Sequence, residues 1–172
     1  MSSNLEAPPL MRKLLIGQLF QNADRLPVYN SIRQIWEMDI MEDGILMKLS
    51  WCMLWLQGRI TKCYHPTNCN FLLDDGTGEM LIVYELNKSQ CINYKPNIGD
   101  YVAVVGKLCQ ADEDSKNETF NCWHILAKSV TKLGSQAVQI GQCESLSQKE
   151  VSNSAIYELS WPLEVVDMMY SL

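Results

Sequence analysis

The sequence predicts an all-β core followed by a C-terminal α-helix. Between residues 48 and 133, five stretches rich in aliphatic, β-branched and aromatic residues alternate with turn signals. In residues 154–172, apolar side chains instead recur at intervals of three and four, which is the spacing of one helix face. The segment between these two parts, residues 134–153, is rich in Ser, Gln and Gly and is typical of a linker.

The first 47 residues carry weaker patterns, and we expect an N-terminal extension that packs in part on the core. Residues 10–20 fit a helix through Leu10, Leu14 and the pair Leu15 and Leu19, whereas the interruption at Gly17 slightly favours a strand. Turn signals follow at Pro27 and Asp43-Gly44, between short apolar pieces.

The five predicted strands of the core occur in a characteristic order. A hairpin turn, Asp74-Asp75-Gly76-Thr77-Gly78, joins the second strand to the third, and glycine supplies the positive φ that such turns require. A long connection separates the third strand from the fourth, in which Gly106 indicates a bulge or bend. This order predicts a five-stranded OB-fold barrel, with another small β-barrel or a half-sandwich as the alternative. The strands are expected over residues 48–64, 69–73, 79–86, 100–110 and 119–133.

The charge balance argues against strong binding to nucleic acid. The chain has 14 basic and 20 acidic residues and a formal net charge of −6, whereas DNA-binding proteins usually present a basic surface to the phosphates. An OB fold can still hold a single strand with basic and aromatic side chains on its face. We therefore name candidates for weak nucleic-acid contacts, namely Arg59, Lys62 and Lys107.

The sequence gives no sign of catalysis, a metal or a cofactor. It has two histidines, His65 and His124, no cysteine spacing that fits zinc, and no phosphate-binding loop or nucleophile elbow. Asp74 and Asp75 are expected to bond turn amides. The seven cysteines contain no C-x-x-C pair, and no apolar run follows a basic start, so we expect reduced thiols in the cytosol or nucleus. No apolar stretch reaches the ~18 residues that a membrane span needs.

The C-terminal helix carries the strongest candidate for a binding surface. Its apolar residues fall on one face, and such a face must be buried against something. It could cap the barrel, contact a partner, or do both, with Trp161 facing the barrel and Leu163 and Val166 facing the partner. The predicted partner-binding residues are Leu159, Trp161, Leu163, Val166 and Tyr170.

Three stretches resemble one known family. They are Trp55-Leu56-Gln57-Gly58-Arg59-Ile60, then residues 99–106 (GDYVAVVG), and finally residues 158–167 (ELSWPLEVVD). In this order and spacing they resemble the RecQ-mediated genome instability protein 2 family, over nearly the whole chain but with gaps between the three stretches. The D-D-G-T-G turn is less specific, since it is similar to hairpins in OB subunits of replication protein A and of telomere-capping complexes.

This resemblance implies a non-catalytic, nuclear scaffold that forms a heterodimer with the second OB domain of a larger RecQ-mediated instability subunit. The pair joins a topoisomerase III and a Bloom-type RecQ helicase, and the complex dissolves double Holliday junctions in homologous recombination and DNA replication. The resemblance also implies little direct DNA binding and a site for a peptide of a Fanconi-type translocase. The alternative is a single-stranded-DNA-binding OB subunit of a replication protein A-like or telomere-capping complex.

The sequence departs from the family's pattern in two places. The linker over residues 134–153 is longer than the family's usual connection. Pro162 falls inside the predicted C-terminal helix, where it removes a backbone donor and crowds the preceding turn. This leaves open a helix that begins near Ser160, after a separate turn over residues 154–159, which would remove Leu159 from the binding face.

Overall fold

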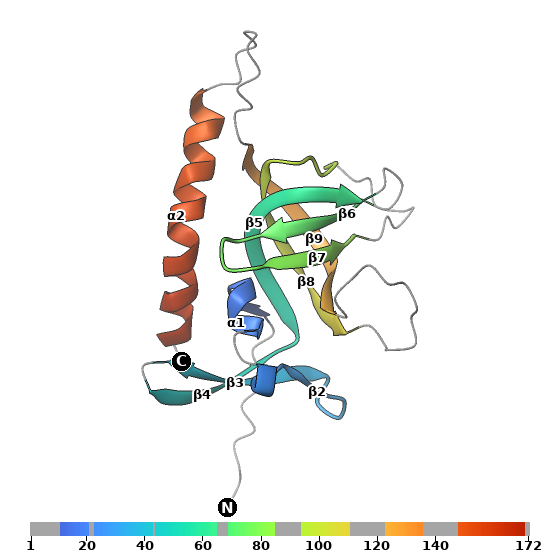
Figure 1. The fold of residues 1–172 in the computed structure, drawn as a ribbon, viewed down its shortest axis with the longest axis vertical. Coiled ribbons are helices and arrows are strands. Elements are labelled where there is room, and N and C mark those ends of the chain that lie inside the picture. The colour runs from blue at the N-terminus through green and yellow to red at the C-terminus, as the bar shows by residue number, and fades with distance from the viewer. Residues whose placement is uncertain are drawn as a thin grey trace, which may run out of the picture.

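The structure is a computed structural model, which describes residues 11–20, 23–42, 44–64, 69–84, 94–110, 123–135 and 148–170. These residues form mostly β-structure, with one long helix, α2, lying beside the strands (Figure 1). In chain order the elements are β1 (Met11–Lys13), α1 (Ile16–Phe20), the 3₁₀-helix η1 (Ala23–Arg25), β2 (Val28–Asn30), β3 (Ile35–Glu42), β4 (Ile45–Trp51), β5 (Met53–Tyr64), β6 (Asn70–Asp74), β7 (Glu79–Val83), β8 (Asp100–Gln110), β9 (Trp123–Ser135) and α2 (Gln148–Tyr170).

Five strands pair in a ring. The pairings run from β5 to β6, β7, β9 and β8, and β8 pairs again with β5. The β7–β9 pairing is parallel and the other four are antiparallel. These strands correspond to the five that the sequence predicts, but β1 and a separate sheet of order β2-β3-β4 bring the described strands to nine.

The prediction of one long first strand over residues 48–64 is wrong. The chain bends at Cys52, and this bend divides the segment into β4 and β5. Buried side chains lie close to the bend on both sides, since Trp51 and Leu54 are 0% exposed. The apolar run therefore continues without a polar gap while the chain passes from one sheet to the other. The boundary predicted between residues 47 and 48 falls inside β4.

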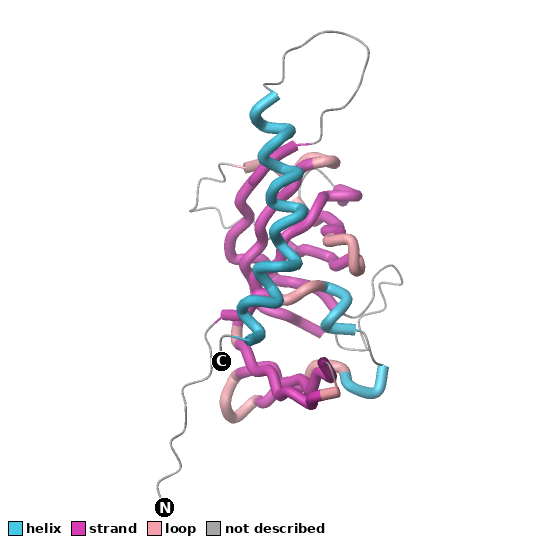
Figure 2. Tube along the Cα trace, turned by 90° about the vertical axis from the view of Figure 1, so that its left-hand side faces the viewer, coloured by secondary structure: helices cyan, strands magenta, loops and turns pink. Residues whose placement is uncertain are grey.

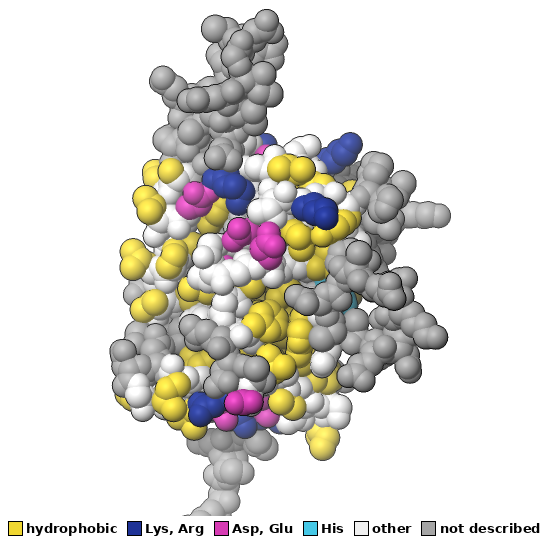
Figure 3. Space-filling view, in the orientation of Figure 1, with side chains coloured by type: hydrophobic (Ala, Val, Ile, Leu, Met, Phe, Trp, Pro, Cys, Tyr) yellow, Lys and Arg dark blue, Asp and Glu magenta, His cyan; other side chains and the backbone are white. Residues whose placement is uncertain are grey.

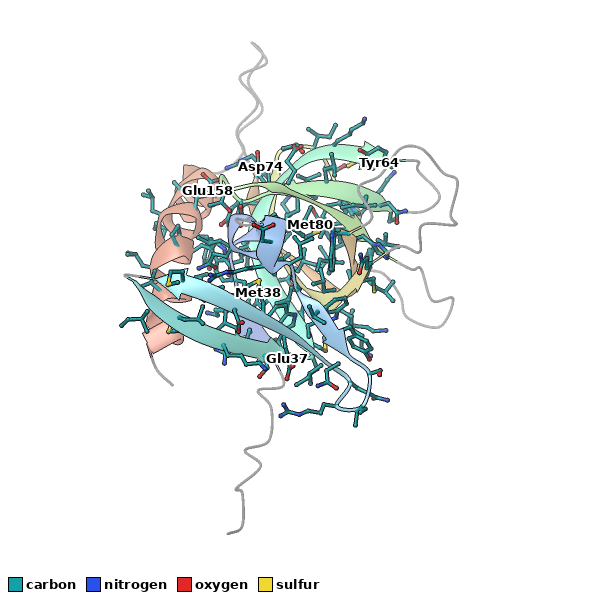
Figure 4. The ribbon with its side chains drawn as sticks, turned by 60° about the horizontal axis from the view of Figure 1, so that its bottom comes forward. Glu37, Met38, Tyr64, Asp74, Met80 and Glu158 are labelled. Carbon is teal, nitrogen blue, oxygen red and sulfur yellow. The ribbon has the colours of Figure 1, made fainter. Side chains whose placement is uncertain are left out.

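The β2-β3-β4 sheet shares the core of the ring. Trp36 and Met38 of β3 and Leu49 and Trp51 of β4 belong to the same buried cluster as the side chains inside the ring. The Trp36 indole N–H donates to the carbonyl of Leu108 at 3.0 Å, which ties β3 to β8. In Figure 4, Met38 and Met80 mark the two sides of this common core.

The hairpin turn between β6 and β7 also fixes the N-terminal segment. Its aspartates bond turn amides as expected, since the Gly76 N–H donates to Asp74 Oδ1 at 2.7 Å. In addition, the N–H groups of Ile16 and Gly17 donate to Asp75 Oδ2 at 2.6 Å and to Thr77 Oγ1 at 2.8 Å. These contacts satisfy two free amides at the start of α1.

Residues 11–20 combine the two structures that the sequence left open, and Leu10 lies outside the described residues. Met11–Lys13 form β1, which pairs parallel with β5, and Ile16–Phe20 form α1. A Cβ on Gly17 would lie 2.9 Å from both Cβ and the carbonyl oxygen of Thr77. A larger side chain at position 17 would clash with the hairpin turn that α1 contacts, which explains the glycine there. The sequence alone suggested that Gly17 interrupts a strand. At Gly106 the expected irregularity is confirmed, because the β8–β9 register shifts between Val105 and Gly106.

The C-terminal helix is longer than the sequence predicts. It begins at Gln148, inside the predicted linker, and continues through Pro162. The alternative start near Ser160 is therefore wrong. Proline disfavours a helix interior by ~3 kcal/mol, and here Trp161, directly before it, and Val165, three residues after it, are buried against the strands. Figure 2 shows α2 running along the body of strands for most of its length.

Candidate protein-interaction surface

The inner face of α2 docks on the chain's own strands. Trp161 is 1% exposed and Val165 is 0% exposed. They pack against partly buried side chains that come from the segment before α1, from the β3–β4 hairpin and from β5, namely Leu15, Ile40, Met47 and Trp55. The rings of Trp161 and Trp55 have centroids 6.5 Å apart and are tilted by 35°. Trp161 and Val165 are four residues apart, and two side chains at this spacing lie one above the other on a helix.

Two ion pairs hold α2 on either side of Trp161. The ammonium of Lys13 in β1 lies 2.6 Å from Glu164 Oε2, and it also lies 4.5 Å from the centroid of the Trp55 ring. The guanidinium of Arg59 in β5 pairs with Glu158; Figure 4 labels Glu158 at the edge of α2 that faces the strands. Together with the buried tryptophan, these contacts fix both the position of α2 and its rotation about its own axis.

The outer face of α2 carries an exposed apolar row, which we call the outer stripe. Ile156 is 62% exposed, Leu159 77%, Leu163 68% and Val166 39%. At 3.6 residues per turn, this row lies on the side of the helix opposite Trp161 and Val165. Hydrophobic side chains accordingly line the edge of the molecule that α2 forms in Figure 3. The side chain of Tyr170 lies outside the described part of the chain.

Three of the five predicted partner-binding residues thus lie together on one exposed face. Trp161 does not join them, because its side chain is buried between α2 and the strands. Val165, Glu158 and Glu164, which position the helix, are not among the residues that the sequence pattern predicts for the binding surface. The i, i+4 spacing of Trp161 and Val165, off the predicted stripe, was a signal that could have found the docking face.

The three basic residues predicted to contact nucleic acid do not form one patch. Arg59 is engaged by Glu158 and donates to the Gly99 carbonyl at 2.7 Å. Lys62 lies over the Tyr64 ring, 4.8 Å from its centroid. Arg59 is aligned with Tyr101 in β8, so Lys107 lies six residues, or about 20 Å, further along that strand.

A buried carboxylate locks β8 to β9. Asp100 accepts hydrogen bonds from the Tyr94 hydroxyl at 2.6 Å and the Ser135 hydroxyl at 2.9 Å, and Lys132 lies 3.1 Å away. Burial alone would raise the pKa of Asp100, but these three partners outweigh it and lower the pKa. Burial and the bond to Asp100 raise the pKa of Tyr94. All partners are mutually satisfied, so this cluster has a structural role.

Two features of the described residues bear on other kinds of site. No group of three or more His, Cys, Asp or Glu side chains among them is arranged to hold a metal ion. Within the same residues, no helix combines the length and hydrophobicity needed to cross a bilayer. Three of the described cysteines, Cys63, Cys69 and Cys109, are free thiols.

A comparison with protein-family models decides the family. The model for RecQ-mediated genome instability protein 2 matches residues 10–169, which covers every strand of the ring and nearly all of α2. The chain belongs to the RecQ-mediated genome instability protein 2 family. This membership confirms the resemblance seen in the sequence, and it indicates a role in genome stability together with an OB-fold partner of a RecQ complex.

Other comparisons add distant likenesses to the family match. A search of curated proteins finds no match. Among solved structures, the chain is similar to a chain of a replication protein A heterotrimer bound to single-stranded DNA, at 16% identity and a TM-score of 0.42, covering 90% of this chain and 97% of that one. It is also similar to the Entamoeba histolytica asparaginyl-tRNA synthetase in complex with asparaginyl-adenylate, at 14% identity and a TM-score of 0.41, covering 62% and 27%.

Proposed function

We propose that this chain is a non-catalytic scaffold subunit of a nuclear complex of a Bloom-type RecQ helicase and topoisomerase III that dissolves double Holliday junctions. It pairs with the OB domain of a larger RecQ-mediated instability subunit through the outer face of α2. The strand number and connection order of the β5 to β9 ring support an OB-fold barrel on which α2 is mounted. Family membership supports the setting, and the geometry of α2 supports the mode of pairing.

The observation that carries this proposal is the two-sided character of α2. One side is buried on the chain's own strands, and the other presents four aliphatic side chains to solvent. Single exposed apolar residues are common, but a continuous row on a rigid element is typical of a protein interface. A row with helical spacing fits the apolar face of a partner helix or a groove.

The anchoring of α2 favours tight pairing. Ordering a loose segment at the moment of binding costs free energy, whereas an element already held in place avoids that cost. Lys13–Glu164, Arg59–Glu158 and the buried Trp161 hold the helix before any partner arrives. The outer stripe is thus presented in a fixed orientation, as a scaffold subunit requires.

Co-purification from the cells that make the protein tests the proposal. A tagged full-length chain, isolated from nuclear extract in stoichiometric amounts and analysed by mass spectrometry, should bring down a larger OB-containing subunit, a topoisomerase III and a RecQ helicase. The Ile32→Asp variant, altered at a residue 93% exposed in the β2–β3 turn, serves as a matched control and should recover the same set. Recovery of the chain as a monomer, without these proteins, would contradict the proposal.

Direct DNA binding distinguishes the proposal from the alternative function as a single-strand-binding subunit. Because the basic side chains are dispersed and partly engaged, we expect no tighter affinity than ordinary non-specific binding, roughly 10⁻⁴ to 10⁻⁶ M. Fluorescence anisotropy with a labelled single-stranded oligonucleotide at about 150 mM salt measures it. A nanomolar dissociation constant would favour the alternative.

A further inference from the structure

The β3–β4 hairpin bears a second set of exposed apolar side chains at its tip. Met41 is 55% exposed, Ile45 65% and Leu46 56%. Met41 is aligned with Leu46, and Ile45 is the first residue of β4. We call these three residues the hairpin tip.

The side chains on the inner face of this hairpin are buried near Trp51 and become exposed toward its tip. Side chains alternate between the two faces of a strand, so Ile45, Met47, Leu49 and Trp51 share one face. Trp51 and Leu49 are 0% exposed, and Met47 packs against the Trp161 and Val165 cluster under α2. Ile45 lies on the same face, beyond the part of the hairpin that α2 covers. The hairpin therefore projects past the surface that its own domain can bury.

The hairpin tip adjoins the outer stripe. Ile40 and Met47, directly behind the tip, contact the cluster of Trp161 and Val165 on the inner side of α2. Figures 1 and 4 both place the end of the hairpin beside the C-terminal part of α2. Ile45 lies on the same face of the hairpin as Met47, which contacts α2, whereas Met41 and Leu46 lie on the opposite face. The exposed apolar side chains of the tip thus surround the end of the hairpin that lies beside α2.

The size of the surface indicates what covers it. A stable interface covers about 800 Å² on each partner, and one exposed Leu, Ile or Met side chain offers on the order of 100 Å² of apolar surface. The four residues of the outer stripe supply roughly half of that area. The hairpin tip brings the apolar surface close to the size of a complete interface.

We propose that the hairpin tip is a second contact site for the same partner subunit, continuous with the outer stripe, so that one folded, apolar partner surface covers both. This inference rests on the proposed function, because it takes the partner of α2 as its occupant. The hairpin is a paired, preformed element, so its contribution carries little ordering cost.

The test compares tip and stripe variants for binding to the purified larger OB-containing subunit. Ile45→Asp and Leu46→Asp should each weaken binding by at least tenfold, with the melting temperature of the isolated chain kept. Ile32→Asp, which adds the same charge at a remote turn, should bind as wild type does. If the charge lowers the melting temperature, the truncation Ile45→Ala should still weaken binding about threefold.

Each other outcome has a separate meaning. Wild-type affinity for every tip variant, while Leu163→Asp loses binding, overturns the second site and leaves the proposed function standing. Wild-type affinity for both the tip variants and Leu163→Asp contradicts the proposed function itself. The remaining alternative is that a second copy of this chain occupies the tip, and sedimentation of the isolated chain tests it. A dimer that Ile45→Asp makes monomeric would assign the tip to a second copy and overturn the inference.

Discussion

The double variant Leu163→Asp/Val166→Asp should lose stable pairing with the larger subunit. Burying one Leu or Val side chain contributes about 1.5–3 kcal/mol, and an unpaired charge buried in its place costs several kcal/mol more. Since 1.4 kcal/mol corresponds to a tenfold change, we expect the dissociation constant to rise by at least about 1,000-fold. Isothermal titration calorimetry with the purified partner measures this change.

The fold of the isolated double variant should be intact, because Leu163 and Val166 are 68% and 39% exposed and face away from the strands. Its melting temperature should therefore stay within a few degrees of the wild-type value. Ile32→Asp controls for added negative charge. An affinity within threefold of wild type would show that the outer stripe is not the interface.

Replacing Trp161 by alanine should have the largest effect on stability. Truncating a buried tryptophan typically costs 3–5 kcal/mol, because its transfer free energy is lost and a cavity remains. For a chain of this size, this corresponds to a fall in melting temperature of about 10 °C. The same variant should bind the partner more weakly, since the outer stripe loses its fixed orientation once the helix loosens.

Thermal melting followed by circular dichroism, with hydrogen exchange of the α2 amides, checks this expectation. Trp161→Phe, which keeps an aromatic ring in the cluster, should restore most of the stability and the protection of α2. If Trp161→Ala melts at the wild-type temperature and α2 stays protected, then the helix is held by contacts other than the buried cluster.

The core strands could be predicted because their signals are local. The hairpin turn over residues 74–78 and the strand over residues 100–110 follow from turn chemistry and alternating apolar residues, and the structure confirms both. The division at Cys52 could not be predicted, because both strands have buried side chains next to it, Trp51 and Leu54, and no polar residue separates them. Which sheet a strand joins depends on tertiary contacts, and a continuous apolar sequence does not show where the chain passes from one sheet to another.

The candidate site was predicted only in part for a similar reason. The seven-residue spacing identified the outer stripe. Trp161 was counted among the partner-binding residues, and only the two-sided alternative turned it toward the barrel; in the structure its side chain faces inward. The continuation of α2 through Pro162 depends on contacts with β1 and β5, about 100 residues or more earlier in the chain. Local propensity at the proline favours a helix end, and tertiary packing overrides it. The hairpin tip was marked only by the turn signal at Asp43-Gly44.

The central claim is that one face of α2 docks on the chain's own strands while the opposite face meets the partner. Site-specific photo-crosslinking in the assembled complex tests it most directly, with a benzophenone side chain placed at Leu163 or, as a control, at Ile32. We predict a single covalent product between this chain and the larger subunit from position 163, and none from position 32. If the complex assembles fully and position 163 gives no product with the larger subunit, the assignment of the outer stripe is contradicted.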